Sequence, residues 1–183
     1  MSTWTRWAIC DILQAIPMKL LLLVLATIQI SPSAQVVQTR TFQIMAPQGW
    51  VVADTGGLIW LNHSTGASVM VLRSRQTEKL DSFARRGVER IMSPLGFAKF
   101  DEPRRFTGNG EEWVQYEIRG NRLSERRRIL YRAVRRKSGL IEFVYENSED
   151  RFDVLLTEAQ TIASSVQEIP EAPTRGRATR PIR

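Results

Sequence analysis

Few side chains in this sequence could carry out acid–base or nucleophilic chemistry. His63 is the only histidine among 183 residues, and its neighbours Asn62, Ser64 and Thr65 are typical of a turn. A general base or a zinc site needs a second positioned group, and no Gly-x-Ser-x-Gly motif offers a nucleophile. Cys10 is the only cysteine, so a disulfide within the chain is excluded. We therefore expect no enzyme and no catalytic residue, with His63 in a loop.

Four acidic residues could offer oxygen ligands to a divalent ion: Glu149, Asp150, Asp153 and Glu158. They lack the loop spacing of a calcium site, and the start of a helix favours acidic residues in any case. The glycines at 56–57 and 108–110 are too few for a phosphate-binding loop and predict turns instead. The sequence therefore predicts no metal and no cofactor.

Cations are concentrated between Arg119 and Lys137, where nine arginines and lysines stand against Glu125 alone, in a chain of net charge +7. One interpretation is structural: Arg128 and Arg132 lie opposite carboxylates on the neighbouring strands, at Glu117, Glu142 and Glu146. The arginines at the expected turns have no such partner, and they form a candidate anion-binding patch: Arg122, Arg126, Arg135 and Arg136.

An exported protein meets polyanions as phospholipid headgroups, acidic glycans and acidic protein surfaces. Four arginines near the C-terminus could reinforce the patch: Arg175, Arg177, Arg180 and Arg183. Nucleic acid is disfavoured because a binding platform needs exposed aromatic side chains, and Tyr131 is expected to be buried. A purely structural or solubility role for the arginines is the alternative.

The elements that must position these side chains are three strand-like runs in a row. Alternation of period two runs through residues 113–118, 128–134 and 141–146. Gly120-Asn121 and Lys137-Ser138-Gly139 predict the reversals between them. Reversals this short make the three strands antiparallel.

A helix is expected to follow, with Ser148 as its N-cap. Its apolar residues recur every three or four positions: Phe152, Leu155, Leu156, Ala159, Ile162, Ala163 and Val166. We expect this stripe to cover one face of the three strands, made by Ile118, Ile129, Tyr131, Ile141 and Phe143, and the opposite face to be uncovered.

The earlier part of the chain predicts strands at 41–45, 50–53, 58–62 and 67–73, then a helix capped by Thr77 and stopped at Ser93-Pro94. A further strand is expected at 97–105. We find no internal repeat. The predicted fold class is α+β, a mostly antiparallel β-sheet with a mid-chain helix and a C-terminal helix packed on it.

The element order and two short segments, Ala46-Pro47-Gln48-Gly49-Trp50 and the helix from Asp150-Arg151-Phe152 to Ser164-Ser165-Val166, resemble the PsbP-like superfamily. That superfamily includes the photosystem II extrinsic subunit PsbP, DcrB-type bacterial envelope proteins and Ran-binding relatives. The resemblance covers residues 38–168. It implies a fold and a non-enzymatic accessory or binding role, and it places no metal or partner residue on this chain.

Residues 1–34 are predicted to be a leader, because Met18-Lys19 opens an apolar run from Leu20 to Ala26 that exits into Ser31-Pro32-Ser33-Ala34. Cleavage falls after Ala34 or Ser33; an uncleaved anchor is the alternative. Residues 1–17 either extend the leader or precede a true start at Met18. Residues 35–169 then form one domain, and 170–183 a basic disordered tail.

We therefore expect an exported, periplasmic or secreted protein without a membrane span after cleavage. Its predicted function is that of a non-catalytic binding or accessory protein of the cell envelope, whose partner is an unidentified protein or an anionic envelope surface. The alternative function is binding to an anionic surface, lipid headgroup or acidic glycan, through the arginine-rich hairpin at 119–137.

Overall fold

Three long strands form the middle of an antiparallel sheet: β8 (Glu111–Arg122), β9 (Glu125–Arg136) and β10 (Gly139–Ser148). The computed structural model describes residues 34–38, 42–54, 58–74, 76–108, 110–137 and 139–169. The predicted leader and basic tail lie outside these residues, apart from Ala34. The three-strand meander was predicted correctly.

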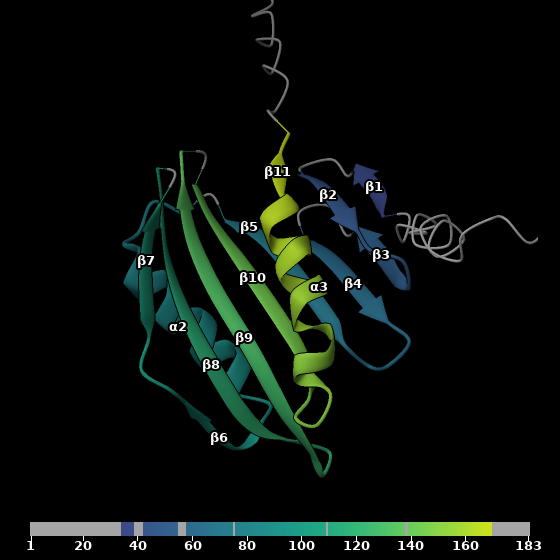
Figure 1. Cartoon of the computed structure of the whole chain (residues 1–183). Helices are drawn as coiled ribbons and strands as arrows, with labels where there is room; N and C mark the ends of the chain where they lie inside the picture. The colour runs from purple at the N-terminus through teal and green to yellow at the C-terminus, as the bar shows by residue number, and fades with distance from the viewer. Residues whose placement is uncertain are drawn as a thin grey trace, which may run out of the picture. The chain divides into compact units, whose positions relative to one another are not determined.

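The full sheet has the strand order β3-β4-β5-β10-β9-β8-β6, and β7 pairs with β8 along the same edge as β6 but at the other end of β8 (Figure 1). The added strands are β3 (Trp50–Asp54), β4 (Leu58–His63), β5 (Ser68–Ser74), β6 (Gly96–Phe100) and β7 (Arg104–Gly108). The single strand predicted at 97–105 is therefore wrong, because the chain breaks into β6 and β7 around Pro103. A second, small sheet joins β1 (Gln35–Gln38), β2 (Phe42–Ala46) and β11 (Gln167–Glu168).

The two described helices cover opposite faces of the large sheet (Figure 1). Helix α3 (Phe152–Ser165) buries the predicted apolar stripe, with Phe152 and Ile162 almost wholly inaccessible to solvent. Helix α2 (Leu80–Met92) buries Phe83 and Val88 on the other face. The expectation of an uncovered face is therefore wrong, while the fold class, α+β with a mostly antiparallel sheet, is confirmed.

The register between β9 and β10 divides the predicted core between these two faces. Phe143 pairs with Arg132, and Val144 pairs with Tyr131, so Tyr131 and Phe143 point to opposite sides of the sheet. Ile118, Ile129 and Tyr131 pack under α2, whereas Ile141 and Phe143 pack under α3. The prediction that all five lie under the closing helix was wrong, because a shift of one residue in pairing reverses every side chain of a strand.

The turn between β8 and β9 is Leu123-Ser124, not Gly120-Asn121 as predicted. Both turn residues have positive φ, 49° and 71°, as a two-residue hairpin of type I′ requires. Gly120 instead lies inside β8, where an added Cβ would come within 3.0 Å of Leu95 Cβ. This glycine allows the chain after α2 to approach the sheet closely.

Neither predicted helix cap is present. Ser148 is the last residue of β10, and α3 begins four residues later, at Phe152, without a side-chain cap. A hydrogen bond from Ser148 instead lowers the pKa of Asp150 below its ordinary value. Helix α2 begins after Lys79, so Thr77 does not cap it. Both helices are held mainly by burial of their apolar faces, which usually outweighs local propensity.

Replacement of Gly87 by Ala is expected to destabilise the protein, although Ala is the better helix former by about 1 kcal/mol. A Cβ at this position in α2 would lie 2.6 Å from Glu142 Oε1 and closer still to the hydroxyl oxygen of Tyr131. We predict a loss of about 1–3 kcal/mol in the free energy of unfolding, measured by urea titration. Gly108→Ala is the control, because nothing lies within 4 Å of its added Cβ. Equal effects of the two changes would show that α2 does not pack this closely.

Candidate functional site

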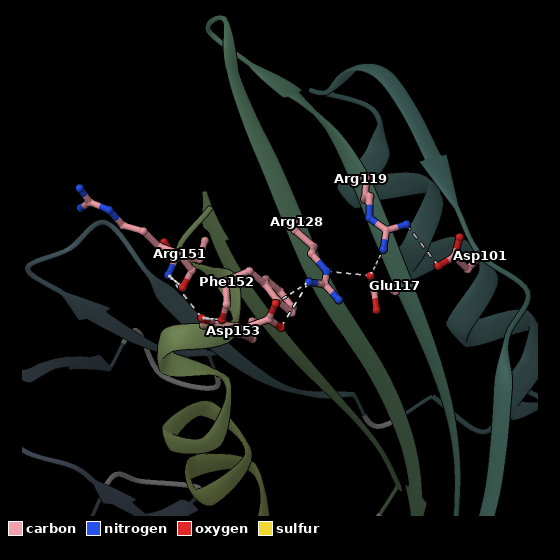
Figure 2. A network of polar contacts seen from close by, with 9 residues as sticks. Asp101, Glu117, Arg119, Arg128, Arg151, Phe152 and Asp153 are labelled. Carbon is pink, nitrogen blue, oxygen red and sulfur yellow. Dashed lines mark hydrogen bonds and ion pairs between the residues drawn. The ribbon is translucent and has the colours of Figure 1, made fainter. Parts of the chain in front are cut away.

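Arg128 connects the sheet to the first turn of α3. Its Nε lies 2.7 Å from Glu117 Oε1, its Nη1 lies 3.1 Å from Asp153 Oδ2, and its guanidinium carbon lies 4.3 Å from the centre of the Phe152 ring. Figure 2 shows Arg128 between Glu117 on one side and the start of α3 on the other. The predicted pairing of Arg128 with Glu117 is confirmed.

This pairing shifts the pKa values of both Arg128 and Glu117. The hydrogen bond from Arg128 lowers the pKa of Glu117, and the same bond raises the pKa of Arg128. Arg119 also pairs with Glu117 and reaches Asp101 at 3.5 Å (Figure 2). Glu117 therefore accepts hydrogen bonds from two guanidinium groups, and Arg119 and Arg128 are both held in place by ion pairs within the protein.

The other predicted cross-strand pairs are wrong, because Glu142 and Glu146 lie on the α2 side of the sheet. Glu142, which is 1% exposed, accepts a hydrogen bond from the Tyr131 hydroxyl at 2.9 Å and pairs with Arg90. Burial, reinforced by the charge of Glu142, raises the pKa of Tyr131 above its ordinary value. Glu146 pairs with Arg127 at 2.9 Å. Arg132, which was expected to pair with these carboxylates, faces the opposite side.

The four arginines of the candidate anion-binding patch all have partners, contrary to the expectation from sequence. Arg122 pairs with Glu146 at 3.0 Å, and Arg126 lies 3.9 Å from Glu149. Arg135 donates to the Glu78 carbonyl at 2.7 Å. Arg136 pairs with Glu111 at 2.7 Å and donates to the Val166 carbonyl at 3.0 Å.

The same four arginines also do not form one surface. Arg122 and Arg126 flank the β8–β9 turn, whereas Arg135 and Arg136 lie at the other end of β9. About nine residues of strand separate Arg126 from Arg135, which corresponds to roughly 30 Å. Of these two places, only the end of the sheet at the β8–β9 turn remains a candidate for contact with an anionic surface.

His63 is the last residue of β4 and serves the turn that follows. Its Nδ1 lies 2.9 Å from the Thr65 hydroxyl and accepts a hydrogen bond from the Thr65 amide at 3.3 Å. Its ring lies 5.3 Å from the ring of Trp50. Within the described residues, no group of three or more His, Cys, Asp or Glu side chains could hold a metal ion.

A pocket of about 520 Å³ lies on the α3 side of the sheet, between β7, the long strands and the last turn of α3. We call it the Arg132 pocket. Its apolar lining includes Val71, Val134, Ile141, Phe143, Ala163 and Val166, and its polar lining includes Thr107, Glu111, Arg132, Arg136 and Ser164. Phe106 and Trp113 complete its aromatic wall.

Arg132 is the cation of this pocket that has no carboxylate partner within the described part of the chain. Its guanidinium carbon lies 4.0 Å from the centre of the Trp113 ring, and its Nη2 donates to Gln115 at 2.9 Å. Its Nε is buried without a hydrogen-bond partner. Burial lowers the pKa of Arg132, and no neighbouring acid is among the causes of this shift.

The aromatic wall holds Arg132 in place from one side. Trp113 stacks on Phe106 with 4.2 Å between ring centres and 20° between ring planes. The guanidinium on the other face of this pair gains cation–π attraction, which is stronger where water is excluded. The pocket therefore presents a rigid, partly desolvated cation beside an apolar surface.

Sequence reasoning missed this pocket. Its residues come from β5, β7, β8, β9, β10 and α3, and only the strand register brings them together. Trp113 and Arg132 belong to neighbouring strands with an offset that no motif encodes. The one available signal was Arg132 inside the run at 129–134, which is otherwise made of apolar and aromatic residues.

Several solved structures resemble this chain, including the following three. Cyanobacterial PsbP (CyanoP) from Synechocystis sp. PCC 6803 has a TM-score of 0.55 and 19% identity, over 75% of this chain and 94% of its own. PA94 from Pseudomonas aeruginosa, a putative regulator, has a TM-score of 0.48 and 12% identity, over 75% of this chain and 88% of its own. LpqN of Mycobacterium tuberculosis, involved in cell envelope biogenesis, has a TM-score of 0.43 and 14% identity, over 76% of this chain and 85% of its own.

The protein has a PsbP-like fold, as the resemblance in its sequence implied. No family model matches the sequence, and no curated protein matches it. At these identities the likeness concerns the fold alone.

Acid is expected to destabilise the protein partly through Glu117. Because the pKa of Glu117 in the folded chain is lowered from its ordinary value of 4.5, this carboxylate stabilises the fold above that pH. The contribution is lost as pH falls through the lowered pKa. Urea midpoints measured from pH 6 downward should therefore fall less for Glu117→Gln than for the wild type. Glu112→Gln removes an exposed charge from the same strand as a control and should follow the wild type; if Glu117→Gln does so too, the pair contributes nothing to the pH dependence.

Proposed function

We propose that this protein is an exported, non-catalytic binding protein of the cell envelope, and that its ligand occupies the Arg132 pocket. The observation that carries this proposal is the half-buried guanidinium of Arg132, whose Nε is buried without a hydrogen-bond partner, which has no carboxylate partner in the described part of the chain, and which lines a pocket of about 520 Å³. A partly buried cation without an acidic partner is costly, and groups of this kind in a pocket often belong to a functional site.

Export and the absence of catalysis are supported by the sequence. The lysine, apolar run and small residues at 19–34 have the form of a signal peptide. Within the described residues, no helix is long and apolar enough to span a bilayer. The only histidine forms hydrogen bonds with Thr65 of the turn that follows it, which supports a structural rather than a catalytic role for this side chain.

The proposal is tested by recovery of a bound molecule from the source envelope. Ser164 is exposed and lines the pocket, so Ser164→Trp should place a large ring across the opening while the core is unaltered. The tagged full chain is purified without denaturation, and extracts are compared by mass spectrometry. We expect a small molecule with the wild type, a loss of at least tenfold with Ser164→Trp, and a chain that begins near Gln35.

Thr161→Trp is the matched control, because Thr161 is exposed one helical turn earlier and does not line the pocket. It should retain the molecule. Equal recovery from all three proteins, or none from the wild type, would contradict binding in this pocket.

A second candidate function is contact with an anionic lipid surface through the β8–β9 turn. Leu123 in the turn is 97% exposed and Phe97 in β6 is 92% exposed, although both are large apolar residues. Both have positive φ, 49° and 51°, which is unfavourable for such side chains. The Arg126 side chain at the same end is 81% exposed. This combination of apolar and basic side chains is typical of a membrane-surface contact.

Sedimentation with vesicles tests this second candidate. The full chain should sediment with vesicles of phosphatidylglycerol and phosphatidylcholine, less with phosphatidylcholine alone, and less as salt rises, because screening shortens the reach of surface charge to about 8 Å at physiological ionic strength. Arg126→Ser should weaken binding about fivefold, corresponding to about 1 kcal/mol per basic residue at the surface. Phe97→Ser with Leu123→Ser should weaken it further.

Arg85 on α2 is a matched control, since its side chain is also 81% exposed. Arg85→Ser should leave sedimentation unchanged. If the three substitutions at the turn end behave like Arg85→Ser, this second candidate is wrong.

A further inference from the structure

The charges that line the Arg132 pocket leave one positive charge uncompensated. Arg136 is neutralised by Glu111, which lies 2.7 Å away on the neighbouring strand. Arg132 has only the Gln115 amide and the Trp113 ring as partners in the described residues. The lining therefore carries two cations and one anion, and the excess charge belongs to Arg132.

The apolar part of the lining lies directly beside this cation. Phe143 pairs with Arg132 across the β9–β10 ladder, and Val71 pairs with Phe143 across the next ladder. Val134 and Ile141 form the adjacent row on the same face. Ala163 and Val166 of the α3 end close the other side. A ligand that fills this site meets one guanidinium without a carboxylate partner among the described residues, that of Arg132, and a continuous aliphatic and aromatic surface.

We infer that the Arg132 pocket binds an amphipathic monoanion, a carboxylate carried on an apolar chain; this inference rests on the proposed function. The carboxylate pairs with the Arg132 guanidinium, which forms strong hydrogen bonds with carboxylates. The apolar chain covers Phe143, Ile141 and Val134 and gains about 0.8 kcal/mol for each buried CH₂ group.

The arrangement favours one negative charge over two. A dianionic phosphate monoester would bring a second negative charge that no unpaired cation of the described lining balances, because Arg136 is already paired with Glu111. A carboxylate satisfies Arg132 without this excess charge. The pocket volume of about 520 Å³ is within the usual range for small-molecule sites and accepts a chain of about ten carbons.

Isothermal titration of the full chain with decanoate tests the ligand class. We expect saturable binding at one site per chain. Decanol and decylammonium lack a negative charge, and each should bind at least tenfold more weakly than decanoate. Acetate, which lacks the apolar chain, should not bind detectably. Decyl phosphate at pH 8 should bind more weakly than decanoate, because it is then a dianion.

Variants of Arg132 test the role of the guanidinium. Arg132→Met keeps a long side chain beside Trp113 without charge, and we expect its affinity for decanoate to fall about 10- to 100-fold, as for a lost charge-assisted hydrogen bond. Arg132→Lys keeps the charge without the planar donor group and should fall between the wild type and Arg132→Met. Arg85→Met, an exposed arginine on α2, should bind like the wild type.

Several outcomes would overturn the inference. They are decanol, decylammonium or decyl phosphate binding as tightly as decanoate, no binding of decanoate, or unchanged decanoate affinity in Arg132→Met. If Arg132→Met fails to fold, the wild-type ligand series and Arg132→Lys decide the matter. If decanoate does not bind but a molecule is still recovered from the envelope in a Ser164-dependent way, the ligand class is wrong and the proposed function stands. If decanoate does not bind and no molecule is recovered from the envelope, both the ligand class and the proposed function are wrong.

Discussion

The pairing register of β9 with β10 is the constraint on which the rest of this structure depends. Because Phe143 pairs with Arg132 and Val144 pairs with Tyr131, each face of the sheet receives an apolar set from one strand and a mixed set from the next. Both faces then need a cover, and α2 and α3 provide one each. The same register places arginines of β9 under or beside α3, where water is scarce and each needs a partner.

Three arginines at intervals of four residues along β9 share the α3 face, and each is satisfied in a different way. Arg128 is bound by the carboxylates of Glu117 and Asp153, and it fixes the start of α3. Arg136 is bound by Glu111 and by a carbonyl beyond the end of α3. Arg132 lies between them and rests on Trp113. The two outer arginines therefore act as structural supports, while the central one keeps its charge available.

The exposed side chains also fall into two groups, arginines that are paired and large apolar residues that are not covered. Within the described residues, most of the exposed arginines form ion pairs, which in such positions contribute little to stability. Phe97 and Leu123 differ from this pattern, because large apolar side chains are exposed on a backbone of positive φ. Unfavourable backbone conformations of this kind often occur where a segment has a function other than stability.

The sequence alone determined the elements that depend on local periodicity and chain reversal. The apolar spacing of residues 152–166 required a helix with one buried face, and alternation through 113–146 required antiparallel strands, since both patterns follow from backbone geometry. These local patterns, together with the two short segments, were enough to indicate the PsbP-like fold, and His63 with its polar neighbours was enough to indicate a turn.

Only the tertiary structure decided which strand face meets which helix, and therefore which arginines are paired. Tyr131 and Phe143 are equally apolar in sequence, and a shift of one residue in pairing sends them to opposite sides. Arg132 was for the same reason expected beside Glu142, whereas it lies against Trp113 on the other face. Register arises from long-range packing of both faces at once, and no local pattern records it.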